Sequence, residues 1–434
     1  MTPEPKQKTT ATKSTEAARK VRGIVKTLNL RAQEAHGRGL KTAYCMVGCN
    51  YDEILWAMDI VPIWTENFAG LCAAKRVAQP MLVKAEAEGY SNVICGYART
   101  GIGYDAYRKE LGSPPEGAPD GGMAEPDLLL GCSATCDPRF KWYQALGRYR
   151  DSPIYNFDIV TPPMEANLDE VRDYYCGYQK EQFQGLISFL EAQTGKKMDY
   201  GRLMEGLLRA EKTRKLWWEC YELRKAIPCP MSAPDHFNTF VPGYFLVCED
   251  AAYDFYRELY SELKDKVEKG LGVVQEEKYR LIWGGGLPPW HSMNIFDYFA
   301  GLGAVFVRET SYRPPDPFTV QGSDPLQIMA ERAFCRFTCR YERARKGPGD
   351  AQVQLLLDFI EQYHVDGIVM HATRSCRATT IGQMHFKSLM QNFVRAPTLF
   401  MESDLIDMRD YSESQTHHNI EDFMELVAGQ KNSD

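Results

Sequence analysis

The sequence predicts an α/β fold with parallel sheets in two separate units. Short apolar runs alternate with helical patterns between residues 40 and 160, and the alternation resumes near residue 276. Such alternation is typical of parallel strands joined by helical crossovers. We therefore expect a polar tail and helix at 1–38, a first α/β domain at 39–165, a helical and proline-rich region at 166–275, and a second α/β domain at 276–434.

The first elements are a polar tail and an amphipathic helix. Residues 1 to about 15 are rich in Thr and Lys, a composition typical of disorder. Apolar residues then recur with helical spacing over 14–37, which predicts one buried helix face. The first domain is expected to contain strands at 42–48, 60–64, 92–95, 128–130 and 152–159, with helices at 52–58 and from about 105.

The middle region is expected to be helical over 168–224 and 250–269, with two proline-rich loops at 229–237 and 240–245 between these helices. The alternating pattern of the second domain then predicts strands at 279–283, 304–307, 367–370 and 398–401, with helices at 293–301, 325–345, 353–363, 384–393 and 420–427.

Composition and charge exclude several classes of protein. The net charge of -7 argues against binding nucleic acid, which needs a basic face. No apolar run approaches the roughly 20 residues of a membrane span, and the N-terminus lacks the apolar core of a signal peptide. We therefore expect a cytoplasmic protein, whose 13 cysteines stay reduced.

Three cysteines follow predicted strands and stand among Gly, Ser, Thr and Arg residues. They are Cys95, Cys136 and Cys376. Strands that end in such loops are where α/β proteins present ligands, so we interpret the three thiols as holders of one metal cluster. Thiolates are soft ligands that suit iron–sulfur, and three of them leave one iron of a [4Fe–4S] cluster open to water or substrate.

Other motifs favour structural interpretations. The pairs Cys45/Cys49 and Cys335/Cys339 lack zinc-site spacing, and we expect them to pack. The run 101–106 has the form G-x-G-x-x-A, but it predicts a tight loop more than a dinucleotide site. The triple glycine at 284–286 is either a turn or a close approach to a ligand. The phosphate-loop motif is absent, so we expect this chain not to hydrolyse ATP.

Two side chains are candidates for moving protons. Glu53 begins a predicted helix directly after the strand at 42–48, and burial there would raise its pKa toward neutrality. The alternative is that Glu53 only stabilises the helix start through the helix dipole. His291 lies in a strand-end loop of the second domain and is the companion candidate.

Four places in the sequence resemble the 2-hydroxyacyl-CoA dehydratase/benzoyl-CoA reductase family. They are CNYDE at 49–53, TCD at 135–137, DGIV at 366–369 leading to Cys376, and the C-terminal runs ESDLIDMR at 402–409 and DFME at 422–425. The resemblance implies two flavodoxin-like (Rossmann-like) domains around one [4Fe–4S] cluster. It also implies that Cys95, Cys136 and Cys376 are the cluster ligands, and that Glu53 is the acidic residue near the substrate.

The resemblance further implies a complex. Its other parts would be a related smaller catalytic subunit and ATP-hydrolysing activator subunits, with their own [4Fe–4S] cluster, that pass single electrons from ferredoxin to an aromatic acyl-CoA. Dehydratase subunits usually have Pro where this chain has Asp52, and this chain is long. Both features look more like the larger catalytic subunit of an ATP-dependent benzoyl-CoA reductase. A 2-hydroxyacyl-CoA dehydratase subunit and a non-catalytic electron-relay subunit are the alternatives.

Overall fold

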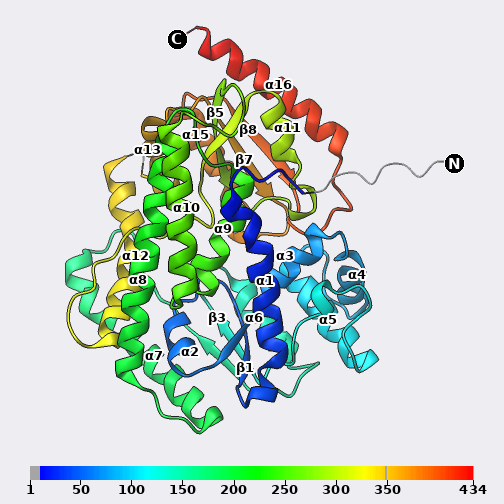
Figure 1. Cartoon of the computed structure of the whole chain (residues 1–434), viewed down its shortest axis with the longest axis vertical. Helices are drawn as coiled ribbons and strands as arrows, with labels where there is room; N and C mark the ends of the chain where they lie inside the picture. The colour runs from blue at the N-terminus through cyan, green and yellow to red at the C-terminus, as the bar shows by residue number, and fades with distance from the viewer. Residues whose placement is uncertain (1–9, 348, 434) are drawn as a thin grey trace, which may run out of the picture.

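The computed structural model describes residues 10–347 and 349–433, and it contains two four-stranded parallel sheets (Figure 1). The strands are β1 (Thr42–Cys45), β2 (Val61–Trp64), β3 (Leu128–Cys132), β4 (Ile154–Phe157), β5 (Tyr279–Gly285), β6 (Ala304–Glu309), β7 (Gly367–Thr373) and β8 (Thr398–Ser403). Their orders are β2-β1-β3-β4 and β6-β5-β7-β8, so both sheets repeat one arrangement. The predicted α/β class is confirmed.

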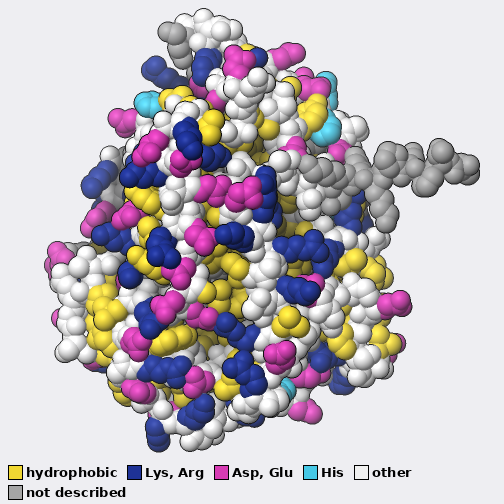
Figure 2. Space-filling view, in the orientation of Figure 1, with side chains coloured by type: hydrophobic (Ala, Val, Ile, Leu, Met, Phe, Trp, Pro, Cys, Tyr) yellow, Lys and Arg dark blue, Asp and Glu magenta, His cyan; other side chains and the backbone are white. Residues whose placement is uncertain are grey.

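Helices surround both sheets. Those of the first part are α1 (Glu16–Glu34), α2 (Asp52–Ala57), α3 (Thr65–Ala74), α4 (Gln79–Ala87), α5 (Gly96–Leu111), α6 (Asp137–Leu146), α7 (Leu168–Thr194) and α8 (Tyr200–Glu222). The later ones are α9 (Ala233–Phe245), α10 (Asp250–Glu268), α11 (Ile295–Gly301), α12 (Pro325–Lys346), α13 (Ala351–Tyr363), α14 (Arg377–Thr380), α15 (Gln383–Phe393) and α16 (Glu413–Lys431). Figure 1 shows α8, α10 and α12 running lengthwise along one side of the molecule, on the left of the view. Figure 2 shows charges of both signs interspersed over this face.

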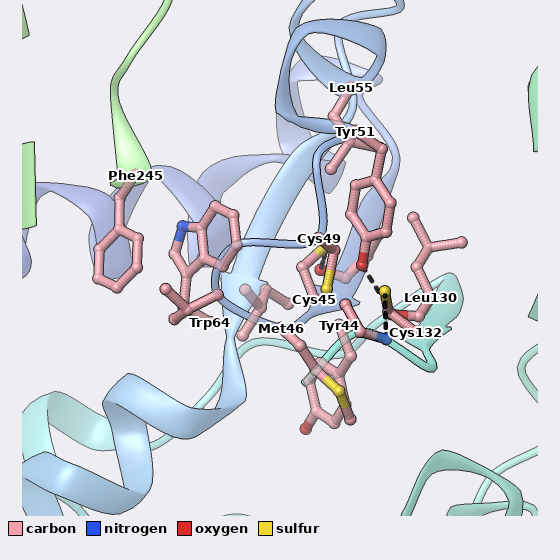
Figure 3. Packing of buried hydrophobic residues seen from close by; sticks show 14 of the residues in the cluster. Tyr44, Cys45, Met46, Cys49, Tyr51, Leu55, Trp64, Leu130, Cys132 and Phe245 are labelled. Carbon is pink, nitrogen blue, oxygen red and sulfur yellow. Dashed lines mark hydrogen bonds between the residues drawn. The ribbon is translucent and has the colours of Figure 1, made fainter. Parts of the chain in front are cut away.

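The sheet cores explain why the central strands were predictable. Every residue of β3 and of β7 is buried, as expected for parallel strands covered by helices on both faces. Figure 3 shows Cys45, Cys49 and Cys132 within the core of the first sheet, where each has no exposed surface. The predicted packing role of Cys45 and Cys49 is therefore confirmed.

The N-terminal segment is held in place from residue 10 onward. The backbone N–H of Thr12 donates to Asp297 Oδ1 at 2.8 Å, and that of Ser14 donates to Asp235 Oδ1 at 3.0 Å. Helix α1 then starts from the N-cap Thr15 and packs against α9 and α10. The prediction of disorder is wrong for residues 10–15, and its first nine residues lie outside the described part.

The prediction of two proline-rich loops is also wrong for all of 240–245 and for the second half of 229–237, because residues 233–245 form α9. Ser232 and Asp235 make a capping box at its start, and Pro234 occupies the first turn, where no backbone N–H is needed. Pro242 lies inside the helix, which is stabilised by its buried aromatic side chains, Phe240 among them.

The segment before Cys95 is not a strand. Val93 is 67% exposed, and α5 begins directly after Cys95, so the predicted loop at 101–106 is helical as well. Its glycines serve close packing. A Cβ on Gly101 would lie 2.2 Å from the Trp142 ring, and one on Gly103 would lie 1.8 Å from the Met81 carbonyl oxygen.

Replacing Gly103 by Ala is therefore expected to destabilise the chain by about 3 kcal/mol, because the obstructing atom is backbone and cannot rotate away. Thermal unfolding of the purified protein measures this. Gly177→Ala in α7 is the matched control, since its Cβ would meet nothing within 4 Å. That change is expected to stabilise by up to about 1 kcal/mol. Equal effects of the two substitutions would contradict the packing argument.

Candidate functional site

The three cysteines singled out in the sequence come together where the carboxyl ends of the two sheets meet. Cys136 follows β3 and Cys376 follows β7, which occupy the same position in the two sheet orders. Next to Cys95, the N–H of Gly96 donates to Ser375 Oγ at 3.1 Å. Beside the other two, the ion pair Arg377–Asp137 spans 3.8 Å.

Electrostatics also place these thiols near one another. Burial raises the pKa of Cys95, and nearby Cys136 and Cys376 raise it further. Burial raises the pKa of Cys136 to about 11, although the Arg139 guanidinium opposes this shift. Each cysteine precedes a helix, namely α5, α6 or α14, so backbone N–H groups point toward the region where a thiolate would form.

The three thiols are the residues of this site that could serve as ligands to a metal cluster. Within residues 10–347 and 349–433, no His, Cys, Asp and Glu side chains gather closely enough to hold one metal ion. Cys95, Cys136 and Cys376 are partly exposed, and they come from three separate elements. Such thiols are the ligands that hold [4Fe–4S] clusters.

Arg139 on α6 fixes the loop that carries Cys136. Its Nη1 donates to Thr135 Oγ1 at 3.1 Å and to the Ala134 carbonyl at 3.3 Å. Its Nη2 lies 3.2 Å from Glu66 Oε2. Thr135 has a φ of 72°, a left-handed conformation that costs energy for a β-branched residue, so these contacts hold the loop in an otherwise unfavourable shape.

A cavity of about 550 Å³ lies beside this loop, with Thr135 in its wall. Its aromatic lining consists of Tyr244, Tyr312, Phe318, Phe337 and Phe386. Its cationic lining consists of Arg214, Arg313, Arg332, Arg336, Arg340 and Arg343, set against Glu211 and Asp316. Cys335 and Cys339, predicted to pack, line this cavity instead. The cavity thus offers both an apolar and a strongly cationic surface.

The triple glycine contributes to the same place. Gly285 lines the cavity with a φ of +75°, and a Cβ there would lie 2.7 Å from the His371 carbonyl oxygen. The neighbouring Trp283 has no exposed surface and packs against Phe296 and Phe306. The glycine run therefore serves close strand packing as well as the cavity wall.

Glu53 is fully buried in an ion cluster behind the cavity wall. Its Oε1 lies 2.7 Å from Arg332 Nη1 and 3.0 Å from Arg214 Nη1, and both arginines also contact Glu211. Burial alone would raise the pKa of Glu53, but the two guanidinium groups outweigh it and lower the pKa to about 2. The predicted rise toward neutrality is wrong. Glu53 does not line the cavity, whereas the two arginines that it holds do.

Asp52, the neighbour of Glu53, has the opposite shift. Burial and the Glu53 charge raise the pKa of Asp52 to about 6. Its Oδ1 is buried without a hydrogen-bond partner among the described residues, and its side chain lines a second cavity of about 380 Å³. The position where this chain departs from the dehydratase pattern therefore carries an acid that titrates close to neutral pH.

The stability of Asp52→Asn relative to wild type is expected to be higher at pH 8 than at pH 4. The raised pKa means that the folded chain binds the Asp52 proton more tightly than the unfolded chain, so stability is lost as pH rises from about 4 through 6. Asn removes this loss, which is at most about 3 kcal/mol. Thermal unfolding of both proteins across this pH range measures it, and parallel stability curves would contradict it.

His291 and His371 are both enclosed by the protein. His291 is buried, with Nδ1 2.8 Å from Ser292 Oγ and Nε2 3.0 Å from the Asp404 carbonyl. Burial lowers the pKa of His291, and lowers that of His371 to about 4. Neither histidine lines the large cavity. A catalytic role for Glu53 or His291 stays a prediction. In the structure both side chains are buried and are held by contacts with other protein groups.

Residues 51–427 match the protein family described as 2-hydroxyglutaryl-CoA dehydratase, D-component. The chain belongs to this family. It is 27% identical to a benzoyl-CoA reductase subunit of Thauera aromatica over 90% of this chain and 89% of that protein. It is 25% identical to the (R)-phenyllactyl-CoA dehydratase alpha subunit of Clostridium sporogenes over 97% of this chain and 98% of that protein. It is 22% identical to the alpha subunit of (R)-2-hydroxyglutaryl-CoA dehydratase of Acidaminococcus fermentans over 94% of this chain and 96% of that protein.

Family membership confirms the resemblance inferred from the sequence. Several residues of this site were not singled out there, namely Arg139, Arg214, Tyr312 and Arg332. One signal was available, because arginines recur with helical spacing over 332–343 and therefore share one face of α12. Among the described helices, none combines the length and apolar character needed to cross a membrane.

Proposed function

We propose that this chain is the iron–sulfur catalytic subunit of an ATP-dependent benzoyl-CoA reductase, acting in the cytoplasm and dearomatising benzoyl-CoA to a cyclohexadiene carbonyl-CoA. The observation that carries the proposal is the meeting of Cys95, Cys136 and Cys376 beside a cavity with aromatic and cationic walls. A [4Fe–4S] cluster bound by these thiols would supply low-potential single electrons.

The cavity lining suits an aromatic CoA thioester. Phe318, Phe337 and Phe386 offer rings against which an aryl group can stack. The arginines match the phosphates of the CoA portion, because guanidinium groups bind phosphate oxygens in pairs. Of these, Arg340 is exposed, and Arg336 contacts the neutral Asn50 at 2.8 Å, so both keep charge available for a ligand.

Other proteins must complete the reaction. The relatives are named as subunits of dehydratases and of a reductase, which supports a related second subunit for this chain. We propose in addition an ATP-hydrolysing activator with its own [4Fe–4S] cluster, and ferredoxin as the electron source, because this chain lacks a phosphate-loop motif.

A 2-hydroxyacyl-CoA dehydratase subunit is the second candidate. The identities of 27% and 25% to the two kinds of relative favour neither, and both reactions begin by adding an electron to a thioester. A non-catalytic relay subunit is less well supported, because a relay needs no large cavity next to Cys136.

Anaerobic purification of the complete complex tests the proposal. The complex is assayed with reduced ferredoxin and ATP against benzoyl-CoA and, separately, against (R)-phenyllactyl-CoA and (R)-2-hydroxyglutaryl-CoA. Turnover of benzoyl-CoA to a diene product is expected. Turnover of a 2-hydroxyacyl-CoA to an enoyl-CoA, with benzoyl-CoA untouched, would establish the dehydratase instead. Binding of these thioesters without any turnover would favour the relay.

A further inference from the structure

Two tyrosines, one buried and one partly buried, connect the start of α5 with the large cavity. Tyr97 lies two residues after Cys95 and is 5% exposed. Its hydroxyl oxygen accepts a hydrogen bond from Trp290 Nε1 at 2.6 Å. The Tyr97 hydroxyl is in turn hydrogen-bonded to the hydroxyl of Tyr312, which lines the cavity. The chain Trp290–Tyr97–Tyr312 therefore runs from the cysteine site to the place where a ligand would lie.

Tyr312 is held rigidly. Its ring stacks on Phe240, with centroids 4.2 Å apart and planes 2° from parallel. Its φ of 52° is a left-handed conformation that costs energy for a bulky side chain, and such outliers cluster at functional sites. Burial raises the pKa of Tyr312, so its phenol stays protonated at any physiological pH.

The hydrogen bonds in this chain have a fixed direction. An indole N–H can only donate, so Tyr97 accepts from Trp290 and keeps its own hydrogen for Tyr312. A hydroxyl that accepts one hydrogen bond becomes a stronger donor, so the bond from Trp290 makes Tyr97 the donor to Tyr312. The hydroxyl hydrogen of Tyr312 is then available to a ligand in the cavity.

We propose that Tyr312 donates a hydrogen bond to the carbonyl oxygen of the bound thioester, and that Tyr97 and Trp290 position it. The inference rests on the proposed function, since it names the group that receives the substrate carbonyl. Negative charge grows on this oxygen when the thioester accepts an electron, in the reductase and in the dehydratase alike. A preorganised donor in a water-poor site stabilises such charge, and losing one typically costs about 10²–10³ in kcat.

Infrared spectroscopy of bound benzoyl-CoA carrying a ¹³C carbonyl tests this in the oxidised complete complex, where no turnover occurs. In the wild type, binding is expected to lower the carbonyl stretching frequency, because the hydrogen bond weakens the C=O bond. Tyr312→Phe is expected to bind the thioester, to lose this shift, and to lower kcat by about a hundredfold or more. Placing 3-fluorotyrosine at 312 is expected to restore the shift, because this phenol is a stronger donor.

Two further variants sharpen the test. Tyr97→Phe keeps the Tyr312 hydroxyl but removes its orienting partner, so a smaller shift and an intermediate kcat are expected. Tyr298→Phe is the matched control, because this partly exposed hydroxyl bonds Glu421 on α16, away from the cavity. An unchanged carbonyl shift in Tyr312→Phe overturns the inference. If no CoA thioester binds the wild-type complex, the proposed function fails first and this inference fails with it.

Discussion

Serine in place of Cys95, Cys136 or Cys376 is expected to remove iron from the complex and to abolish its turnover. A serine hydroxyl is a poor ligand for iron–sulfur, because its oxygen is hard and stays protonated near neutral pH. The three thiols come from separate elements, so no neighbouring thiol on the same element replaces the lost ligand. Iron content and visible absorbance after anaerobic purification measure the effect directly.

Cys335→Ser is the control for iron content. This thiol is partly exposed, like the three proposed ligands, but it lies on α12 and lines the cavity. It is expected to retain a full complement of iron. Full iron content in all three ligand variants would refute the assignment, and iron loss in Cys335→Ser as well would show that the assay reports general damage to the protein.

The strands at the sheet centres could be predicted because they are buried on both faces. The run 128–130 is uniformly apolar, and β3 indeed has no exposed residue. The same rule failed at 92–95, where the apolar Val93 is 67% exposed at the surface. Apolar composition alone does not distinguish a short buried strand from a surface turn. The alternation of apolar runs with helical patterns also did not predict helices α3 and α4. The segment that forms α9 was predicted to be loop because it contains prolines, but one of these prolines suits a capped helix start and another lies in the buried interior of the helix.

The positions of the candidate ligands could be predicted, because each cysteine stands in a local pattern of small residues. The pKa shifts of the site residues could not be predicted from the sequence. Glu53 looks in the sequence like an acid that burial would make neutral, yet its partners Arg214 and Arg332 lie 161 and 279 residues further along the chain. The Tyr97–Tyr312 contact likewise joins two residues that lie far apart in the sequence. Long-range contacts of this kind decide a pKa and leave no local trace in one sequence.

Glu53→Gln is therefore expected to weaken the fold by about 3 kcal/mol, because it removes one ion-pair partner of the buried guanidinium groups of Arg214 and Arg332 and leaves them paired with Glu211. This corresponds to a fall in Tm of about 3 °C for a chain of this size. The lowered pKa of Glu53 also fixes the pH dependence. Its ionised form stabilises the fold above pH 4.5, and this contribution is lost as pH falls from about 4.5 to about 2. The stability difference between wild type and Glu53→Gln should shrink over that interval.

Glu205→Gln on α8 provides the comparison. Glu205 pairs with Arg209 at 2.9 Å, but both side chains are substantially exposed, so its loss is expected to cost less than about 0.5 kcal/mol. Turnover of Glu53→Gln should also fall, because Arg214 and Arg332 line the cavity and lose the anchor that positions them. A roughly hundredfold loss of turnover with unchanged Tm would point instead to direct proton transfer by Glu53. Because a carboxylate with a pKa of about 2 is a weak base and is fully ionised at neutral pH, we expect the fall in Tm and the loss of turnover to appear together.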